Sequence, residues 1–523
     1  MPNPEALSVP NTTVYETLFS DLDPTDADRV AIVEGTSGAE LTFGELRDRV
    51  NAFAGWLAAE GVAPGEVVGL LAPNGPGFAI AFHGILRAGA TATTINGLYA
   101  PAEITNQLRD ASAVALVTVS PLLANALPAV EQLGIPAGRV VVLDGTAGHP
   151  SLADVLAATE QAPDISIDPA THLAVLPYSS GTTGFPKGVM LTHRNLVANV
   201  TQCDVIGLTG RDVVLAVLPF FHIYGMTVLL NYALHQRARL VTMPRFDLAE
   251  FLRIIAEHRT SWVFIAPPIA VALAKHPAVD GVDTSAVKVV FSGAAPLDAR
   301  LADAVADRIG CVVAQGYGMT ETSPVTHVID WQDPDMDRSS IGTPVPGTEA
   351  RVVSAEGNDV EVPGSGPSES GELWIRGPQV MSGYLNNPEA TAATVDADGW
   401  LHTGDLATVD HQGIYRIVDR LKELIKYRGY QVPPAVLEAV LLEHPQIADA
   451  AVVGVLDADG MEFPKAFVVR RPDSGLTAEA VMAFVAARVA AHEKVRAVEF
   501  IDTVPKSASG KILRRQLRTG TTA

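Results

Sequence analysis

The stretch from Ser179 to Gly188 carries the residue types needed to hold a polyphosphate. It reads Ser-Ser-Gly-Thr-Thr-Gly-Phe-Pro-Lys-Gly. Backbone N–H groups of a glycine-rich loop can approach phosphate oxygens with no Cβ in the way, and Lys187 adds a positive charge. A Walker A loop has serine or threonine after its lysine, whereas here Pro186 precedes the lysine and Gly188 follows it. The decapeptide therefore predicts a different phosphate-binding loop; taken alone, it could also be a flexible hairpin tip.

The elements that must position this loop are apolar runs with the length of strands. Residues 173–178 and 189–191 flank it and read as buried strands. Helical patterns alternate with similar runs, and residues 42–61 show capping-box spacing, one apolar face and a closing glycine. This alternation predicts an α/β architecture with parallel sheets. The other expected strands are 67–71, 115–119, 140–143, 213–218, 239–243, 262–266 and 287–291.

A β-rich segment interrupts the alternation. From residue 342 to 377, short β-type runs are separated by glycine and proline. After it, Asn387-Pro388 has the pattern of an N-cap followed by proline at the first helical position. The sequence therefore predicts a smaller β unit followed by a short helix.

Composition bounds the class of protein and its partners. The chain has 523 residues, of which 48% are hydrophobic, so it is expected to be globular with several cores. Its net charge of −22 argues against a nucleic-acid partner, so anionic ligands must be held by local cations and backbone amides. Basic residues cluster late in the chain; for Arg514, Arg515 and Arg518, a solvated face explains the run as well as a role in a site does.

The two cysteines and the chain termini carry no targeting or disulfide signal. Cys203 and Cys311 match no disulfide or metal pattern and are expected to be small apolar fillers. The first residues lack a signal peptide, no apolar run is long enough to span a membrane, and residues 521–523 are not a peroxisomal signal. We therefore expect a cytoplasmic protein with no membrane insertion.

Further motifs follow the loop in a fixed order, and the set as a whole resembles one family. They comprise residues 219–225, 292–297, 315–321, 371–377, 400–405, 419–431 and 505–511. Together with the loop they cover nearly the whole chain, which resembles the adenylate-forming acyl-CoA synthetases and most closely their 4-coumarate–CoA ligase branch. The resemblance implies a large N-terminal domain over 1–418, with two sheet–helix subdomains, a β barrel and the acyl, ATP and Mg²⁺ sites. It also implies a hinge at 419–422 and a mobile α+β lid over 423–523; from the residues alone, 419–422 could equally begin a helix.

The reaction that the resemblance implies begins with attack of a carboxylate on the α-phosphate of ATP. Because both reactants are anions, cations and dipoles must neutralise the developing charge. Lys511, in Ser-Ala-Ser-Gly-Lys, matches the catalytic lysine of adenylation, and Lys426 and Gln431 match aids to that step. Glu321 and Thr182 match the magnesium ligands. The expected ATP/AMP contacts are Ser179, Ser180, Gly181, Thr182, Thr183, Gly184, Lys187, Gln315, Gly316, Tyr317, Thr320, Asp405, Arg420 and Lys511. Among these, Asp405 and Arg420 match the residues that bind the ribose.

The resemblance also implies an acyl pocket. It would be lined by His222, Tyr224, Val228, Phe291, Ala294, Gly318, Pro324 and Val325. These residues predict a narrow apolar slot between two aromatic rings, suited to a 4-coumarate- or cinnamate-type aryl-propenoate. An isolated histidine such as His222 is more often a satisfied core residue, but its motif matches one whose histidine closes the pocket and touches the carboxylate.

The second step transfers the acyl group to coenzyme A. Arg245, Arg428 and Gly429 match coenzyme-A contacts, and the lid would rotate about the hinge between the two steps. The chain ends a dozen residues after Lys511, so no attached carrier domain is expected. The alternatives are a medium-chain fatty acyl-CoA ligase or a freestanding enzyme that loads a carrier protein. A non-catalytic ligand sensor is disfavoured because Lys187, Lys511, Glu321 and Asp405 are all present.

Overall fold

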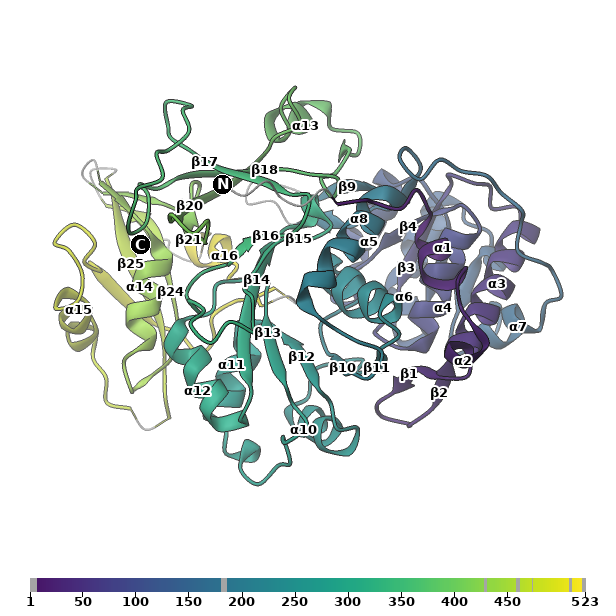
Figure 1. Cartoon of the computed structure of the whole chain (residues 1–523), viewed down its shortest axis with the longest axis horizontal. Coiled ribbons are helices and arrows are strands. Elements are labelled where there is room, and N and C mark those ends of the chain that lie inside the picture. Colours follow the sequence, from purple (N-terminus) through teal and green to yellow (C-terminus); the bar gives the residue numbers. More distant parts are fainter. Residues whose placement is uncertain are drawn as a thin grey trace. The chain divides into compact units, whose positions relative to one another are not determined.

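The structure is a computed structural model that describes residues 7–179, 186–427, 430–457, 461–472, 474–507 and 510–519 (Figure 1). The chain forms two compact units. Unit 1 consists of Met1–Arg338, Thr343–Glu349 and Arg376–Leu401; unit 2 consists of Ser339–Gly342, Ala350–Ile375 and His402–Ala523. The hinge at 419–422 stays a prediction; in unit 2 these residues comprise the last two of a strand and the turn after it, with no helix there.

The larger sheet of unit 1 has nine strands in the part of the chain that is described. In spatial order they are β16 (Thr343–Pro344), β15 (Val325–Val328), β14 (Val312–Gly318), β13 (Val289–Ser292), β12 (Trp262–Ile265), β10 (Val213–Ala216), β11 (Arg239–Thr242), β1 (Val30–Glu34) and β2 (Glu40–Thr42). The strands from β14 to β1 run parallel, as predicted. β2, β15 and β16 pair antiparallel at the two edges, so the predicted parallel pairing does not extend to these edge strands.

The second sheet of unit 1 carries the predicted phosphate loop. Its order is β19 (Gly383–Tyr384), β9 (Lys187–Thr192), β7 (Leu173–Val175), β4 (Thr91–Thr94), β3 (Val67–Leu71), β5 (Ala113–Thr118) and β6 (Val140–Val142), with β8 (Tyr178–Ser179) also paired to β9. The apolar run expected as a single strand before the loop is thus two short strands, β7 and β8. β9 runs antiparallel to β7, β8 and β19.

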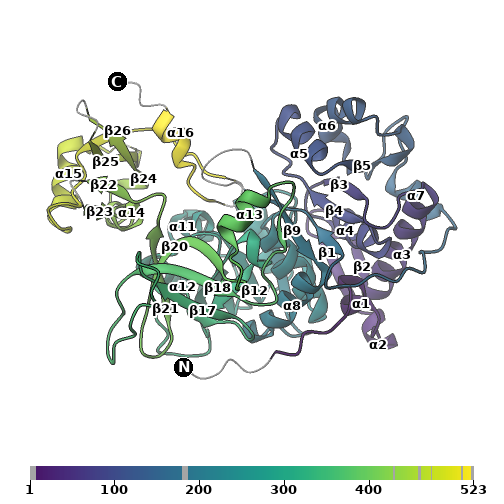
Figure 2. The same ribbon diagram turned by 90° about the horizontal axis from the view of Figure 1, so that it is seen from above.

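Helices cover both sheets of unit 1, and their ends follow the local sequence. In α3 (Phe43–Ala59), the Thr42 hydroxyl and the Glu45 carboxylate form the predicted capping box, and Gly61 follows with a φ of +78°. Figure 1 shows α3 beside α4 and α7, and α12 along β14; Figure 2 shows α5 next to α6. The remaining helices of this unit are α1 (Val14–Phe19), α2 (Pro24–Ala27), α4 (Pro76–Arg87), α5 (Pro101–Asp110), α6 (Ser120–Leu133), α7 (Leu152–Ala157), α8 (His193–Gln202), α9 (Ala233–His235), α10 (Leu248–Glu257), α11 (Pro267–Lys275), α12 (Ala299–Ile309) and α13 (Pro388–Thr394). Asn387 caps α13 and Pro388 opens it, as the sequence predicts.

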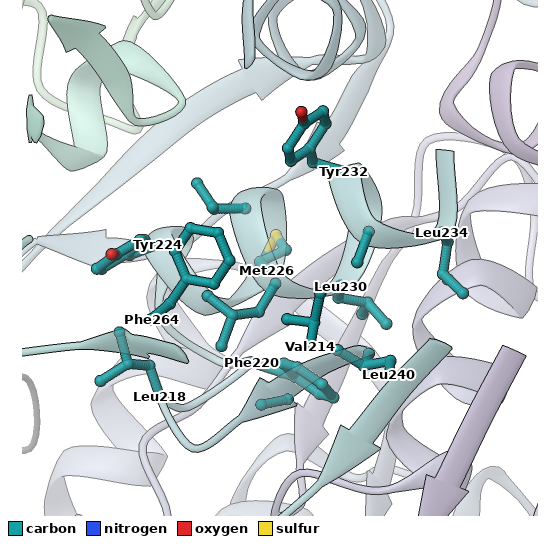
Figure 3. Packing of buried hydrophobic residues seen from close by; sticks show 14 of the residues in the cluster. Val214, Leu218, Phe220, Tyr224, Met226, Leu230, Tyr232, Leu234, Leu240 and Phe264 are labelled. Carbon is teal, nitrogen blue, oxygen red and sulfur yellow. The ribbon is translucent and has the colours of Figure 1, made fainter. Parts of the chain in front are cut away.

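Short 3₁₀ and π segments complete unit 1. The 3₁₀ turns are η1 (Ala137–Arg139), η2 (Cys203–Ile206), η4 (Pro277–Val279) and η5 (Thr320–Thr322). The segment η3 (Gly225–Tyr232) is a π-helix of eight residues, a rare form that is frequent at functional sites. Figure 3 shows its side chains packed among Val214, Phe220, Leu240 and Phe264 in the main core, and Tyr224 lies immediately before it.

Unit 2 is built from three small sheets and three helices, within the described residues. One sheet has the order β17 (Glu349–Val353), β18 (Gly371–Arg376), β20 (Leu401–Val409) and β21 (Tyr415–Arg420); it occupies the region expected to form a barrel. The others are the pair β22 (Ile425–Tyr427) and β23 (Tyr430–Val432), and a sheet of β24 (Ile447–Leu456), β25 (Glu462–Arg470) and β26 (Ala497–Phe500). Figure 2 shows α14 (Pro434–Leu442) and α15 (Ala478–Ala486) beside these last strands, and α16 (Arg514–Thr519) packs on β24.

The predicted fold class is confirmed: the chain is α/β, with two sheet–helix layers in the large unit and an α+β arrangement near its end. Among the described helices, none has both the length and the apolar composition needed to cross a bilayer.

Candidate active site

Both ends of the predicted phosphate loop are held in one hairpin. Ser179 on β8 and Lys187 on β9 are direct partners in the antiparallel ladder. Ser180, Gly181, Thr182, Thr183 and Gly184 lie outside the described residues. The hairpin therefore brings the first and the last of the predicted loop contacts side by side.

A polar cluster in unit 1 surrounds Glu321, the predicted magnesium ligand. Its Oε1 accepts hydrogen bonds from Ser179 Oγ at 3.0 Å and from the Tyr384 hydroxyl at 2.8 Å. Lys187 Nζ lies 4.5 Å from the centre of the Tyr384 ring, within range of a cation–π interaction. Burial raises the pKa of Tyr384, and the Glu321 charge raises it further, so this phenol stays a donor at neutral pH. The cluster thus joins three predicted residues to Tyr384, which was not predicted.

The cluster fits a magnesium ion with few protein ligands. Within the described part of the chain, no group of three or more His, Cys, Asp or Glu side chains is placed to hold a metal. Mg²⁺ in nucleotide sites commonly binds one or two carboxylates and takes its remaining ligands from phosphates and water. Glu321 is only 5% exposed, and both of the hydrogen bonds described above fall on Oε1, which makes Oε2 the better candidate ligand.

All eight residues predicted for the acyl pocket line one cavity of unit 1. The space that the centre of a water molecule can occupy in it is about 50 Å³, so the cavity is small. Its walls are mostly apolar. The lining is Ile206, His222, Ile223, Tyr224, Val228, Phe291, Gly293, Ala294, Gly316, Tyr317, Gly318, Met319, Thr320, Pro324 and Val325.

Aromatic packing fixes one wall of this cavity. The rings of Tyr224 and Phe264 meet edge to face at 6.5 Å, and Phe264 contacts Phe291 at 5.6 Å (Figure 3 shows the first pair). The Tyr224 hydroxyl donates to the backbone oxygen of Phe291 at 3.4 Å. A Cβ on Gly293 would lie 2.7 Å from the Tyr224 ring, so the absence of a side chain there makes room for the ring. His222 also lines the cavity, and its Nδ1 accepts from the Tyr224 N–H at 3.4 Å.

Four of the predicted ATP/AMP contacts lie between residues 315 and 320, and three of them share the lining of this cavity. They are Gly316, Tyr317 and Thr320. The fourth, Gln315, is 4% exposed; its Oε1 accepts from Leu297 N–H at 3.1 Å and its Nε2 donates to the Arg338 carbonyl at 2.7 Å. In this structure the Gln315 amide therefore positions neighbouring backbone.

In unit 2, the two residues predicted to bind ribose form an ion pair. Asp405 on β20 and Arg420 on β21 are direct cross-strand partners. Arg420 Nε lies 3.0 Å from Asp405 Oδ1, and the Asp405 side chain is 6% exposed. The ion pair joins the two neighbouring strands and orients the carboxylate toward the guanidinium.

The predicted lysines of unit 2 lie on short turns and hairpins. Lys511 closes a turn with Ser507, whose N–H donates to the Lys511 carbonyl at 2.8 Å and whose Oγ accepts from the Lys511 N–H at 3.1 Å. Lys426 is exposed on β22, and its backbone pairs with that of Gln431 on β23.

The predicted coenzyme-A contacts are seen only in part. Arg245 is exposed in unit 1. Arg428 and Gly429 lie outside the described residues, as does the side chain of Gln431.

Comparison with known families decides the identity of the fold. The model described as "AMP-binding enzyme" matches residues 23–385, and that described as "AMP-binding enzyme C-terminal domain" matches residues 436–511. The chain belongs to the AMP-binding enzyme family. The predicted resemblance to adenylate-forming acyl-CoA synthetases is confirmed.

Relatives of this AMP-binding enzyme include plant ligases. It is 41% identical to 4-coumarate–CoA ligase 5 of Oryza sativa subsp. japonica over 502 residues, 94% of this chain and 91% of the relative. It is 40% identical to 4-coumarate–CoA ligase 1 of Solanum tuberosum, over 94% of this chain and 90% of the relative.

Solved structures of bacterial enzymes share the fold over nearly the full length. ATP-bound MatB from Rhodopseudomonas palustris superposes with a TM-score of 0.89 at 28% identity, covering 98% of this chain and 99% of that one. A benzoate CoA ligase from Burkholderia xenovorans LB400 gives 0.87 at 27% identity, covering 97% and 100%.

Proposed function

We propose that this AMP-forming acid–CoA ligase activates an aryl-propenoic acid of the 4-coumarate or cinnamate type. The observation that carries the proposal is that all eight predicted acyl-pocket residues line one small cavity, with the rings of Tyr224 and Phe291 in its walls. The plant relatives named above, each aligned over 94% of this chain, support the same acid.

The first step would form a mixed anhydride between the acid and AMP. A carboxylate oxygen attacks the α-phosphorus of ATP, the bond to the bridging oxygen of pyrophosphate breaks, and pyrophosphate leaves with its electron pair. In this proposal Ser179 and Lys187 bind the phosphates, and Lys511 stabilises the negative charge that develops between carboxylate and α-phosphate. Glu321 and Thr182 would hold Mg²⁺, which when bound neutralises phosphate charge. Asp405 and Arg420 would bind the ribose.

The acid would enter the cavity with its ring between apolar walls and its carboxylate near His222. A flat conjugated acid fits a narrow slot better than a bulky one. The Tyr224 hydroxyl already donates to the Phe291 carbonyl, so it is not required to bind a substrate hydroxyl. A site not built around that hydrogen bond discriminates weakly against analogues that lack the hydroxyl. We therefore propose that cinnamate is accepted alongside 4-coumarate.

The second step would use coenzyme A as the thiol. Its sulfur attacks the acyl carbon, AMP leaves, and the thiol proton passes to solvent or to the leaving phosphate. Arg245, Arg428 and Gly429 are proposed as coenzyme-A contacts, and movement at 419–422 as the change between the two steps.

The decisive experiment is a substrate panel with ATP and coenzyme A, read as thioester formed. We expect the highest kcat/KM for 4-coumarate and cinnamate, with values within about a hundredfold of each other. Benzoate and octanoate are the comparison acids. A clear preference for octanoate would replace the proposed acid with a medium-chain fatty acid, a second candidate favoured by the apolar lining of the cavity.

The same panel without coenzyme A tests the other candidates. Acid-dependent exchange of labelled pyrophosphate into ATP reports adenylation alone. Pyrophosphate exchange in this panel, together with no thioester formed in the panel that contains coenzyme A, would indicate a freestanding enzyme that loads a carrier protein. Absence of exchange with every acid would support a ligand sensor.

A further inference from the structure

We infer that Glu372 is a positioning residue for the nucleotide, acting through Gly404 on the ribose-binding residue Asp405. The inference rests on the proposed role of Asp405. The two oxygens of the Glu372 carboxylate have different partners: Oε1 accepts from the Gly404 N–H at 2.9 Å, and Oε2 accepts from the Trp374 indole N–H at 2.9 Å. Gly404 immediately precedes Asp405.

Consecutive residues of β18 support consecutive residues of β20. Besides the bond from Gly404 to Glu372, the Thr403 hydroxyl donates to the Leu373 carbonyl at 2.7 Å. The Trp374 ring stacks on the imidazole of His402, with centroids 3.7 Å apart and planes at 14°. Each residue from 372 to 374 thus contacts one residue of β20: residue 372 contacts 404, residue 373 contacts 403, and residue 374 contacts 402.

The support continues into Asp405 itself. The Thr403 hydroxyl oxygen accepts from the Asp405 N–H at 3.0 Å. On the other side of Gly404, its carbonyl accepts from the Leu421 N–H at 2.9 Å. The peptide groups before and after Gly404 are therefore both held by hydrogen bonds. These bonds fix the position of the Asp405–Arg420 pair.

Gly404 has a backbone conformation that favours glycine, and its N–H is bound by a carboxylate. Its φ is +71°, in the left-handed region where non-glycine residues are rare. The bond from its N–H to Glu372 is charge-assisted, and such bonds are stronger than neutral ones. Because both neighbours of Glu372 are donors, only a carboxylate can accept from both; a glutamine at 372 would turn its NH₂ group toward one of them.

The test compares ATP with deoxyATP, which lacks one ribose hydroxyl, at saturating acid and coenzyme A. The measured quantity is the ratio of kcat/KM for the two nucleotides in the wild type, Glu372→Gln, Trp374→Phe and Asp405→Asn. We expect the ratio to fall about tenfold in Glu372→Gln, since a charged hydrogen bond that positions the ribose site is lost. In Trp374→Phe the carboxylate keeps its bond to Gly404, so a fall of only about threefold is expected. The control is Glu361→Gln, an exposed glutamate of the same unit, whose ratio should equal that of the wild type.

The outcomes separate this inference from the proposed function. If Asp405→Asn retains the wild-type ratio, the proposed ribose site is wrong. If Asp405→Asn loses the ratio while Glu372→Gln and Trp374→Phe keep it, the ribose site stands and the positioning role of Glu372 is wrong. In the double variant Glu372→Gln/Asp405→Asn, the ratio should fall no further than in Asp405→Asn, because both changes act on one contact. A merely structural defect would lower kcat/KM for both nucleotides equally and leave the ratio unchanged, which would also overturn the inference.

Discussion

Tyr384 and Glu321 are joined by a hydrogen bond of 2.8 Å between residues 63 positions apart in the chain. The bond is possible because β19, which ends at Tyr384, pairs with β9, the strand that leaves the phosphate loop. The same phenol ring lies under the Lys187 ammonium. The Tyr384 side chain therefore contacts both Glu321, the proposed magnesium ligand, and Lys187, the lysine proposed to bind phosphate.

Replacing Tyr384 separates these two contacts. Tyr384→Phe removes the hydrogen bond to Glu321 but keeps the ring beside Lys187, whereas Tyr384→Leu removes both. We expect the Mg²⁺ concentration for half-maximal activity to rise about fivefold in Tyr384→Phe, as one buried hydrogen bond is lost. In Tyr384→Leu the KM for ATP should rise as well, since the cation–π contact is also lost. Equal behaviour of the two variants would contradict this division of roles, and melting temperatures serve as the control for folding.

The proposed role of Lys511 predicts a defect confined to one half-reaction. In Lys511→Met, acid-dependent pyrophosphate exchange should fall by at least about a hundredfold because charge stabilisation in the transition state is lost. Thioester formation from synthetic acyl-AMP and coenzyme A should stay within about threefold of the wild type. Lys494→Met is a matched control from the same unit. If Lys511→Met exchanges pyrophosphate at the wild-type rate, the proposed role of Lys511 in adenylation is wrong.

Gly293 predicts a selective effect on the acid. A Cβ at this position would approach the Tyr224 ring to 2.7 Å, so the ring must move relative to the cavity wall. In Gly293→Ala we expect kcat/KM for 4-coumarate to fall about tenfold, a cost typical of overpacking, with an unchanged KM for ATP. Tyr224→Leu in the same background should relieve the contact and recover part of the activity. A loss shared equally by the acid and ATP would instead indicate general damage to the fold.

Arg514 pairs with two carboxylates, so we expect its replacement to destabilise the protein in a pH-dependent way. Its guanidinium binds Glu423 and makes bonds of 2.8 and 2.7 Å to both oxygens of Glu438, and its side chain is only 12% exposed. Burial raises the pKa of Glu438 to about 7, against the lowering effect of Arg514. The raised pKa means that the folded state favours protonated Glu438. The stability that this protonation contributes is fully present below the pKa of Glu438 in the unfolded chain, and it is lost as pH rises through about 7.

Without the arginine the cost of charging Glu438 grows. Arg514→Met should therefore lose roughly 3–5 kcal/mol of unfolding free energy at about pH 8 and clearly less at about pH 5. Denaturant titrations at the two pH values measure this. Arg515→Met, an exposed neighbour, should change little at either pH. A loss that does not vary with pH would exclude titration of Glu438 as its cause.

Much of the acyl cavity could be predicted from sequence because its residues lie within recognisable motifs or a few residues from one. Val228, Phe291 and Val325 come from three separate strands or helices, yet the structure places all of them around one space. Ile206 lines the same cavity and was missed, because nothing in its own short turn distinguishes it from other core residues.

Other residues were missed because their partners are distant in the chain. Tyr384 gains its role only from the pairing of β19 with β9, and Glu372 only from the register that brings Gly404 to it. Arg514 lies in a basic run for which a solvated face was an equal explanation; the packing of α16 on β24 buries it among carboxylates instead.

The π-helix from Gly225 to Tyr232 links backbone length to the shape of the acid site. A π-turn holds one residue more than an α-turn, and each residue of an α-helix advances by about 100° around the axis. We therefore expect the deletion of one residue from this segment to let it form an ordinary α-helix and to turn Val228 relative to the cavity. Such a deletion would change the shape of the acid site without a substitution at any of its lining residues.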